Sequence, residues 1–324
     1  SNEYPFALFP SVFVTYSLTE KQDIQLNYSR KINRPNFFQL IPNYDISDPL
    51  NLSIGNPNLV PEFTNLAEIS YQNQFNNKHS LLTTLYFRNT NDLITRYQYR
   101  DVNPNTAISD SATFNTYANA NSSFTYGLEF TLRDKFISWW DLSTNLNIYQ
   151  TDLKAGNIPG TVNQSQLSWF AKINNNFKLP KNYSIQLSGD YQAKTIQPAS
   201  SSGGGGGGRM GGGGMMGGGF GQSSPGAQGY IKPNYGIDIA IRKDFMKNNA
   251  ASITLQMSDV FRTKLYGSHA ESDFLIYDSQ RRRDPQVARL SFNWRFGKFD
   301  ASLFKRKNMK GEMENMQNAQ QGGM

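Results

Sequence analysis

The sequence predicts an all-β protein whose strands form a transmembrane antiparallel up-and-down β-barrel. Apolar and polar residues alternate with period two along almost the whole chain, and the connections between the alternating segments are short and long in turn. Period-two alternation places successive side chains on opposite faces of a strand. No apolar run approaches the roughly 18 residues that a membrane helix needs. We therefore expect strands to cross the membrane.

The alternation defines about eleven strands of roughly 8–17 residues, longer than the usual 5–6 of a globular sheet. In residues 183–193 (YSIQLSGDYQA), Ile185 and Leu187 share one face, whereas Gln186 and Ser188 share the other. In a membrane barrel the apolar face meets lipid and the polar face lines the lumen. The predicted strands contain residues 11–18, 24–28, 63–75, 80–97, 126–132, 142–148, 166–179, 183–193, 237–241, 253–257 and 290–296.

The connections alternate strictly in length. Short turns are expected at 19–22, 76–79, 134–139, 180–182 and 246–250, and long links at 31–62, about 98–115, 151–163, 196–229 and 262–284. Membrane barrels have short periplasmic turns and longer extracellular loops, and their strands need about 9–11 residues to cross the bilayer. A large soluble antiparallel sandwich with aromatic corners is the alternative, but it has no reason to gather every long loop at one end.

Aromatic residues gather where the strands meet the short turns, as in the interfacial girdle of a membrane barrel. The mean hydropathy is -0.58, which fits a barrel because half of every strand is polar. A closed barrel also pairs every backbone N–H and C=O without exposing an edge to lipid. The residues of this predicted girdle are Phe75, Phe136, Trp139, Trp140, Phe177, Tyr183 and Phe245.

The composition excludes several kinds of site. The chain has no cysteine and two histidines, so disulfides and thiolate metal sites are impossible. His79 lies in a predicted short turn and His269 in a long link, which places them on opposite sides of the membrane. We expect no enzyme activity and no cofactor. The formal net charge is +7, but basic residues are scattered except at 281–283 and in the tail, so no nucleic-acid partner is expected.

The strand count predicts that the chain forms part of a larger barrel. Eleven is odd, whereas bacterial single-chain barrels have an even number of strands. If the last strand, in RLSFNWRFGKF (289–299), descends into the periplasm, the first strand begins on the extracellular side. We expect the C-terminal portion of the barrel.

Residues 28–62 read YSRKINRPNFFQLIPNYDISDPLNLSIGNPNLVPE. This stretch resembles the corresponding segment of TonB-dependent outer-membrane receptors, most closely their Bacteroidetes-type outer-membrane β-barrel branch. The closing strand ARLSFNWRFGK and the preceding MSDVF are similar to that family as well. The matching residues of the first stretch are Asn33, Arg34, Pro35, Asp48, Pro49, Leu50, Gly55, Asn56, Pro57, Asn58, Leu59, Pro61 and Glu62.

The resemblance implies a 22-stranded barrel filled by an N-terminal plug, of which this chain supplies about half. The other barrel half, the plug and its TonB-contacting box then lie outside the chain. The implied location is the cell outer membrane, among its lipid and lipopolysaccharide, with long loops extracellular and short turns periplasmic. Residues 1–299 are expected to form the barrel portion, with a Gly-rich extracellular loop at 197–229, and residues 300–324 a disordered periplasmic tail.

The motif between Asn33 and Glu62 also has a physical interpretation. Proline fixes φ and disfavours helix at the preceding residue, so the Asn-Pro and Val-Pro steps at 56–57 and 60–61 hold the chain extended. Gly55 permits a turn with positive φ. We expect residues 33–35, 55–59 and 61–62 to act as a structural clasp at the rim of the barrel. Direct contact of these residues with a ligand is the alternative.

Residues 203–221 read GGGGGGRMGGGGMMGGGFG. They contain the pattern GxGxxG, but any polyglycine run matches it, and no strand-to-helix unit of the dinucleotide-binding kind surrounds the tract. Its composition instead predicts a flexible loop tip.

The leading functional prediction is TonB-dependent uptake of a scarce or bulky solute; siderophores, oligosaccharides, peptides and metal complexes all fit. A structural or adhesive barrel that binds a surface partner without transport is the alternative, and a soluble β-rich binding domain is a third interpretation. Aromatic and arginine side chains commonly carry recognition energy, although the arginines at 281–283 equally suit lipopolysaccharide phosphates. The candidate ligand contacts are Arg34, Phe37, Phe38, Tyr44, Tyr97, Tyr99, Arg100, Tyr266, Tyr277, Arg281, Arg282 and Arg283.

Overall fold

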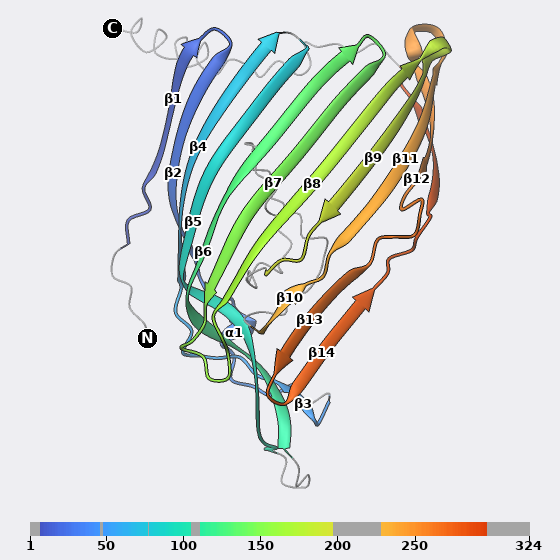
Figure 1. Cartoon of the computed structure of the whole chain (residues 1–324). Helices are drawn as coiled ribbons and strands as arrows, with labels where there is room; N and C mark the ends of the chain where they lie inside the picture. Colours follow the sequence, from blue (N-terminus) through green and yellow to red (C-terminus); the bar gives the residue numbers. More distant parts are fainter. Residues whose placement is uncertain (1–6, 46–47, 77, 105–110, 197–227, 297–324) are drawn as a thin grey trace, which may run out of the picture.

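The computed structural model describes residues 7–45, 48–76, 78–104, 111–196 and 228–296. Its main element is a curved antiparallel wall (Figure 1). Eleven of the twelve strands in this sheet neighbour one another in chain order, and the short β3 (Asn51–Ser53) pairs in parallel with β6. The predicted set of eleven barrel strands is therefore confirmed. They are β1 (Ser11–Thr19), β2 (Gln22–Asn33), β4 (Glu62–Asn76), β5 (His79–Val102), β6 (Ser111–Ile137), β7 (Trp140–Lys154), β8 (Gln164–Leu179), β9 (Tyr183–Gln192), β11 (Asn234–Phe245), β12 (Ala251–Met257) and β15 (Ala288–Trp294).

Three further strands form a separate small sheet in the order β10 (Gly229–Ile231), β13 (Tyr266–Ser272) and β14 (Leu275–Arg281). The described helices are α1 (Phe37–Leu40) and the 3-10 turns η1 (Pro180–Asn182) and η3 (Lys247–Asn249). None of these described helices is long and apolar enough to cross a membrane. The Gly-rich tract at 203–221 and the tail at 300–324 lie outside the described residues.

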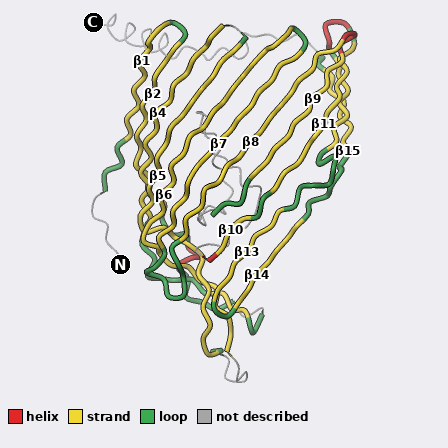
Figure 2. Tube along the Cα trace, viewed as in Figure 1, coloured by secondary structure: helices red, strands yellow, loops and turns green. Residues whose placement is uncertain are grey.

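Short and long connections lie at opposite ends of the wall (Figure 2). The links β1–β2, β4–β5, β6–β7, β8–β9 and β11–β12 are tight, and Lys181 and Asn248 adopt a positive φ of 59° in the last two. The predicted alternation in length is therefore confirmed. The turn predicted at 134–139 is shorter, because β6 continues to Ile137, which pairs with Trp140.

Three predicted long links contain strands within them, so the prediction of loop was wrong at those residues. The link at 98–115 is mostly strand, because β5 and β6 stay in register as far as Val102 and Ser111. Polar side chains of β5 and β6 form hydrogen bonds with one another there: the Gln98 side-chain amide donates to Asn115 at 2.6 Å. The link at 262–284 folds into the β13–β14 hairpin. The link at 31–62 contains α1 and β3.

The two faces of the wall differ in polarity. Leu26, Ile69, Leu85, Leu128 and Ile148 lie opposite one another on five neighbouring strands. The first three keep 46%, 51% and 55% of their surface exposed, because no second sheet covers this face within the described part of the chain. A soluble sandwich needs a dry apolar layer between two sheets, so that alternative is wrong.

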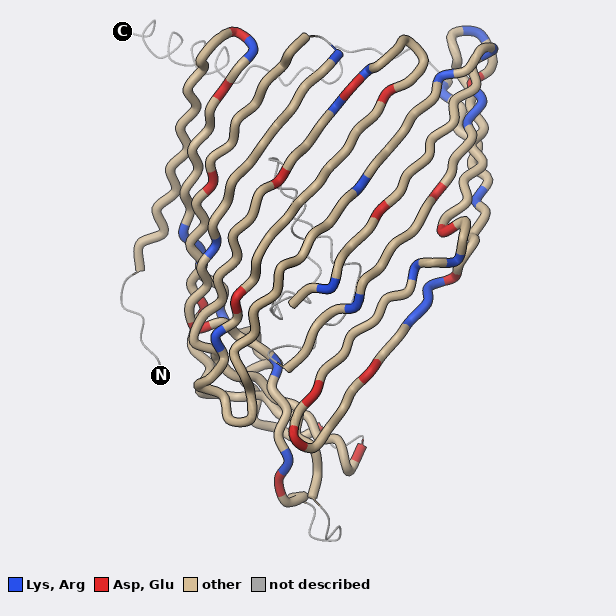
Figure 3. The backbone as a smooth tube through the Cα atoms, in the orientation of Figure 1, with Lys and Arg blue, Asp and Glu red and all other residues tan. Residues whose placement is uncertain are grey.

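The opposite face is polar and hydrogen-bonded within itself. Tyr86 donates its hydroxyl to Asn147 at 3.0 Å, and Asn145 donates to Glu129 at 2.7 Å. Acidic and basic residues are thinly spread along the strands (Figure 3). A face of this composition is typical of a barrel lumen.

The wall remains open at both ends of its strand order. Among the described strands, β1 pairs with β2 alone, and β15 pairs with β12 alone. Every residue of these two strands is exposed. The described residues thus form a barrel wall that does not close on itself, and each edge presents a row of backbone groups available for pairing.

Candidate functional site

The candidate site lies at the long-connection end of the wall, and its first part is the segment that follows β2. Asn36 caps α1: its side chain accepts from the Gln39 N–H at 3.0 Å, and Gln39 Oε1 accepts from the Asn36 N–H at 2.8 Å. Further along, Gly55 N donates to Ile41 O at 2.9 Å and Asn56 N donates to Gln39 O at 2.7 Å. The segment therefore folds back onto its own helix.

Gly55 is required by this close approach of two backbone stretches. A Cβ at this position would lie 2.4 Å from Ile41 O and 2.9 Å from Gln39 O. Among the described glycines, positive φ is found at Gly160 and not at Gly55, so the predicted positive-φ turn is wrong. The position needs the small size of glycine, not its freedom in φ.

Amide side chains fasten the same segment to β5 and β6. The Asn119 side chain accepts from Val60 N at 2.9 Å and donates to Val60 O at 2.9 Å and to Asp92 O at 2.6 Å. Asn56 donates its side-chain amide to Tyr117 O at 2.9 Å. Asn119 thus bonds both the backbone N–H and the backbone C=O of Val60.

Glu62 joins the beginning and the end of the motif. Its carboxylate accepts from the Asn33 side chain at 2.6 Å and from Ile94 N at 2.9 Å. Leu59 and Pro61 beside it are buried. Asn33 and Glu62, at the two ends of the predicted clasp, are therefore in contact with each other and with β5.

The second part of the site is the extension of β5 and β6 past Asp92, which continues beyond the neighbouring strands (Figure 1). Tyr97 stacks on Tyr99 at a ring distance of 5.7 Å, Tyr99 stacks on Phe114 at 5.1 Å, and Tyr44 meets Phe114 edge-on at 6.0 Å. Burial raises the pKa of the Tyr99 hydroxyl, and Tyr44 adds to the rise. These rings form a stiff aromatic row.

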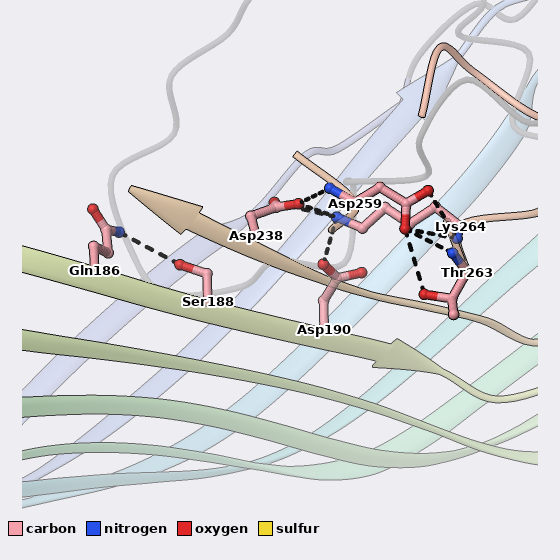
Figure 4. Close-up of polar contacts among 7 residues, drawn as sticks. All are labelled: Gln186, Ser188, Asp190, Asp238, Asp259, Thr263 and Lys264. Carbon is pink, nitrogen blue, oxygen red and sulfur yellow. Dashed lines mark hydrogen bonds and ion pairs between the residues drawn. The ribbon is translucent and has the colours of Figure 1, made fainter. Parts of the chain in front are cut away.

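The third part is the β13–β14 hairpin, which a polar network anchors to the polar face of the wall (Figure 4). Lys264 Nζ lies 2.9 Å from Asp190 Oδ1 and 3.3 Å from Asp238 Oδ2. The Asp259 carboxylate accepts from the backbone N–H groups of Thr263 at 2.8 Å and Lys264 at 3.2 Å. This network fixes the chain just before β13 begins.

The Lys264 side chain reaches the two carboxylates by crossing β11 at a glycine. A Cβ on Gly236 would lie 2.1 Å from Lys264 Cε and 2.4 Å from its Cγ. Any larger residue would therefore displace the lysine. Asp259, at the other side of the network, belongs to the MSDVF stretch singled out in the sequence.

A second ion pair holds the hairpin on its other side. Lys232, next to β10, donates to both Asp278 oxygens at 2.6 Å, and β10 pairs with β13. The hydrogen bond from Lys232 lowers the pKa of the Asp278 carboxyl. His269 Nδ1 lies 3.3 Å from the same carboxylate.

The three parts surround a pocket of about 1040 Å³. The described part of its lining combines aromatic rings with amide and hydroxyl side chains, one arginine and one aspartate. The lining residues are Phe38, Ile41, Asn43, Tyr44, Asp45, Asn51, Ser53, Ile54, Gly55, Arg96, Tyr97, Gln98, Thr113, Asn115, Thr116, Tyr117, Ser268, Ala270, Leu275 and Tyr277.

Four of the predicted ligand contacts meet at this pocket: Phe38, Tyr44, Tyr97 and Tyr277. Tyr99 packs behind it in the aromatic row. The others do not line it. Arg283 lies over the Tyr266 ring at 5.5 Å, and the exposed residues outside the pocket are Arg34, Phe37, Arg100, Arg281 and Arg282.

The sequence interpretation missed the polar part of the lining. Arg96, Gln98, Asn115 and Asn51 all line the pocket. The signal was available in the alternation of β5, because Arg96 and Gln98 share a face with Tyr117 and Asn115 opposite them. Gln98 and Asn115 fall in the predicted link at 98–115, whereas Arg96 lies in the predicted strand 80–97, where its polarity alone does not indicate a ligand site.

The described residues hold no group of three or more His, Asp or Glu side chains that could bind a metal ion. His79 pairs with Asp134 at 2.7 Å at the short-turn end, and His269 belongs to β13 at the other end. The two histidines therefore lie apart, as the sequence predicted.

The sequence profile of the outer membrane protein beta-barrel family matches residues 1–207 and 215–294. The chain belongs to this family. Its curved wall with tight turns at one end is thus part of an outer-membrane β-barrel. A comparison with curated proteins gives no match.

Solved structures share the fold at low sequence identity. The siderophore receptor PirA from Pseudomonas aeruginosa is 15% identical with a TM-score of 0.51, over 79% of this chain and 39% of its own. The ferric-catecholate import receptor Fiu from E. coli is 16% identical with a TM-score of 0.52, over 87% and 34%. The pyoverdine receptor FpvA from Pseudomonas aeruginosa is 12% identical with a TM-score of 0.51, over 89% and 36%. The chain thus corresponds to little more than a third of each receptor, and the narrower Bacteroidetes-type branch stays a prediction.

Proposed function

We propose that this protein is an outer-membrane receptor that takes up a scarce or bulky solute in a TonB-dependent manner. The observation that carries the proposal is the pocket of about 1040 Å³ at the long-connection end of a wall whose fold is shared with solute receptors. The pocket captures the solute, and energy transmitted by TonB moves it onward. Binding sites at the mouth of β-barrels are common.

The open edges of the wall support a larger assembly. β1 and β15 each pair on one side only, and unpaired strand edges are not tolerated in lipid. Further strands therefore close the barrel, with residues 1–299 as about half of 22 strands. A plug domain occupies the lumen against the polar face of the wall and carries the TonB contact.

The direction of the chain in the membrane is part of the proposal. The long connections, including residues 197–229, lie outside the cell, and the short turns and residues 300–324 lie in the periplasm. The exposed row of Leu26, Ile69 and Leu85 meets lipid. The exposed arginines at 281–283 contact lipopolysaccharide phosphates.

Single cysteines test this orientation, because the chain has none of its own. Asp273→Cys lies between β13 and β14, and Glu20→Cys lies between β1 and β2. In intact cells carrying an otherwise cysteine-free full-length protein, a membrane-impermeant maleimide should label the first variant and leave the second unlabelled. Glu20→Cys should react after the outer membrane is permeabilised. The reverse pattern would overturn the orientation.

Transport is tested by accumulation in cells with and without TonB. Cells expressing the full-length protein are given radiolabelled solutes too large for porins, drawn from ferric siderophores, oligosaccharides and oligopeptides. The proposal expects at least one solute to accumulate only when TonB is present and to stay outside cells lacking this protein. Surface binding that is independent of TonB, without accumulation of any solute, would refute uptake and support the structural or adhesive barrel instead.

A further inference from the structure

We propose that the pocket between α1, the β5–β6 extension and the β13–β14 hairpin binds a neutral oligosaccharide. This inference rests on the proposed receptor function and specifies its ligand class. The structural relatives include a siderophore receptor and a ferric-catecholate import receptor, whereas the lining of this pocket favours a different class of ligand. Three features of the lining carry the argument: its charge, its amides and its rings.

The charge of the lining is balanced. Among the described residues that line the pocket, Arg96 is the one basic residue and Asp45 the one acidic residue. The arginines predicted from the sequence as ligand contacts, including Arg100 and the run at 281–283, lie outside the lining. Recognition of an anion favours several arginine or lysine side chains that form charge-assisted hydrogen bonds. The pocket therefore suits an uncharged ligand better than an anionic iron chelate.

The amides of the lining are linked in a relay. Gln98 Nε2 donates to Asn115 Oδ1 at 2.6 Å, and Asn115 Nδ2 donates to Asn51 Oδ1 at 2.6 Å. Within the described structure, the relay ends in the Asn51 amide nitrogen at one side and the Gln98 amide oxygen at the other, without a further hydrogen-bond partner. A sugar hydroxyl can both donate and accept a hydrogen bond. It can therefore accept from the Asn51 amide nitrogen or donate to the Gln98 amide oxygen.

Aromatic rings enter the lining from all three parts of the site. Phe38 and Tyr44 come from the first segment, Tyr97 and Tyr117 from β5 and β6, and Tyr277 from β14. Phe38 keeps 82% of its surface exposed, although large apolar side chains are normally covered. The C–H face of a pyranose ring packs on such rings, and aromatic walls with a few placed polar groups are typical of ligand sites.

The size of the pocket fits a ligand longer than a single sugar. Its volume of about 1040 Å³ slightly exceeds the roughly 300–1,000 Å³ usual for small-molecule sites. Its rings lie on separate chain segments, so they provide separate stacking positions. An oligosaccharide of several residues can occupy more than one of them.

Binding to the full-length protein purified in detergent tests the proposal by isothermal titration calorimetry. The probes are the neutral hexasaccharides of the maltose, cellulose, xylan, mannan and laminarin series. Ferric enterobactin, hexagalacturonate and hexaglycine represent anionic chelates, anionic sugars and peptides. We expect saturable binding of at least one neutral hexasaccharide and none of the three counter-probes at this pocket.

Two variants locate the binding. Tyr277→Ala removes an exposed ring of the lining and should weaken binding about tenfold or more, since aromatic anchors dominate such sites. Phe274→Ala removes an exposed ring from the tip of the same hairpin but outside the lining, and should leave affinity unchanged. Equal affinity of the two variants would overturn the assignment to this pocket.

The remaining outcomes are equally decisive. Binding of no neutral hexasaccharide, or binding of a counter-probe that Tyr277→Ala weakens, would overturn the ligand class. Failure of the receptor function itself looks different. In that case a hexasaccharide binds and Tyr277→Ala weakens it, but cells do not accumulate the sugar in a TonB-dependent manner.

Discussion

Replacing Gly55 with alanine should loosen the segment between α1 and β4. The new Cβ would lie 2.4 Å from Ile41 O and 2.8 Å from Ile41 N, whereas ordinary contacts begin near 3.4 Å. Both neighbours are backbone atoms and cannot rotate away. The two stretches must therefore separate by about 1 Å, the difference between the two distances.

A separation of this size breaks two hydrogen bonds. Gly55 N to Ile41 O, now 2.9 Å, and Asn56 N to Gln39 O, now 2.7 Å, would both exceed the roughly 3.2 Å upper limit of a good N–H···O bond. Each such bond contributes about 0.5–1.5 kcal/mol net. The loss is therefore about 1–3 kcal/mol in the local opening free energy, or roughly 5–150-fold in the opening equilibrium.

Hydrogen–deuterium exchange of the full-length protein in detergent measures this effect. Peptides that contain Gly55 and Asn56 should exchange faster by that factor, because exchange follows local opening. The strands of the wall should keep their protection, since they lie outside the contact. Gly156→Ala is the matched control in another long connection, where the added Cβ would meet only Asn163 Oδ1 at 3.6 Å.

The outcome that would refute the reasoning is unchanged exchange at both amides. If Gly55→Ala and Gly156→Ala exchange alike in these peptides, the close approach does not hold the segment. The clasp would then depend on Asn119 and Glu62 alone.

Three further predictions concern the wall and the hairpin. Leu187→Arg, on the apolar face, should cost about 2–4 kcal/mol of folding free energy if it lies near the bilayer midplane, and Gln186→Arg much less; equal losses in urea titrations in lipid vesicles would contradict the assignment of the faces. Lys264→Met removes the cation that pairs with Asp190 and Asp238. Because loss of one partner of a buried pair costs about 3–5 kcal/mol and these groups are partly exposed, the expected cost is about 2–4 kcal/mol, seen as faster hydrogen exchange in the β13–β14 hairpin. Unchanged exchange would show that the ion pairs do not anchor the hairpin. Lys232→Met should raise the pKa of Asp278 toward its ordinary value of 3.8, as an NMR titration would show. Because the lysine favours the carboxylate, its stabilising contribution is present above pH 3.8 and is lost as the pH falls through the lowered pKa, so an unshifted titration in the variant would argue against the pair.

The sequence alone determined the wall. Period-two alternation in segments such as 183–193 depends only on which face each side chain occupies, and that is a local property of a strand. The short turns could also be predicted, because each lies between two alternating segments that are close together in the chain. These features gave the eleven strands, their order and their two faces.

The tertiary structure decided the site. Gly55 and Ile41 meet, and Lys264 crosses β11 at Gly236, through contacts between residues that are distant in the chain and carry no local pattern. The polar ends of β5 and β6 show no apolar face, because their side chains hydrogen-bond to one another, as Gln98 does to Asn115; their alternation therefore does not predict strand. Which aromatic residues share a pocket depends on how three long connections pack against one another. That packing is decided by contacts between side chains of different segments. The alternation of apolar and polar residues within one segment does not reveal these contacts.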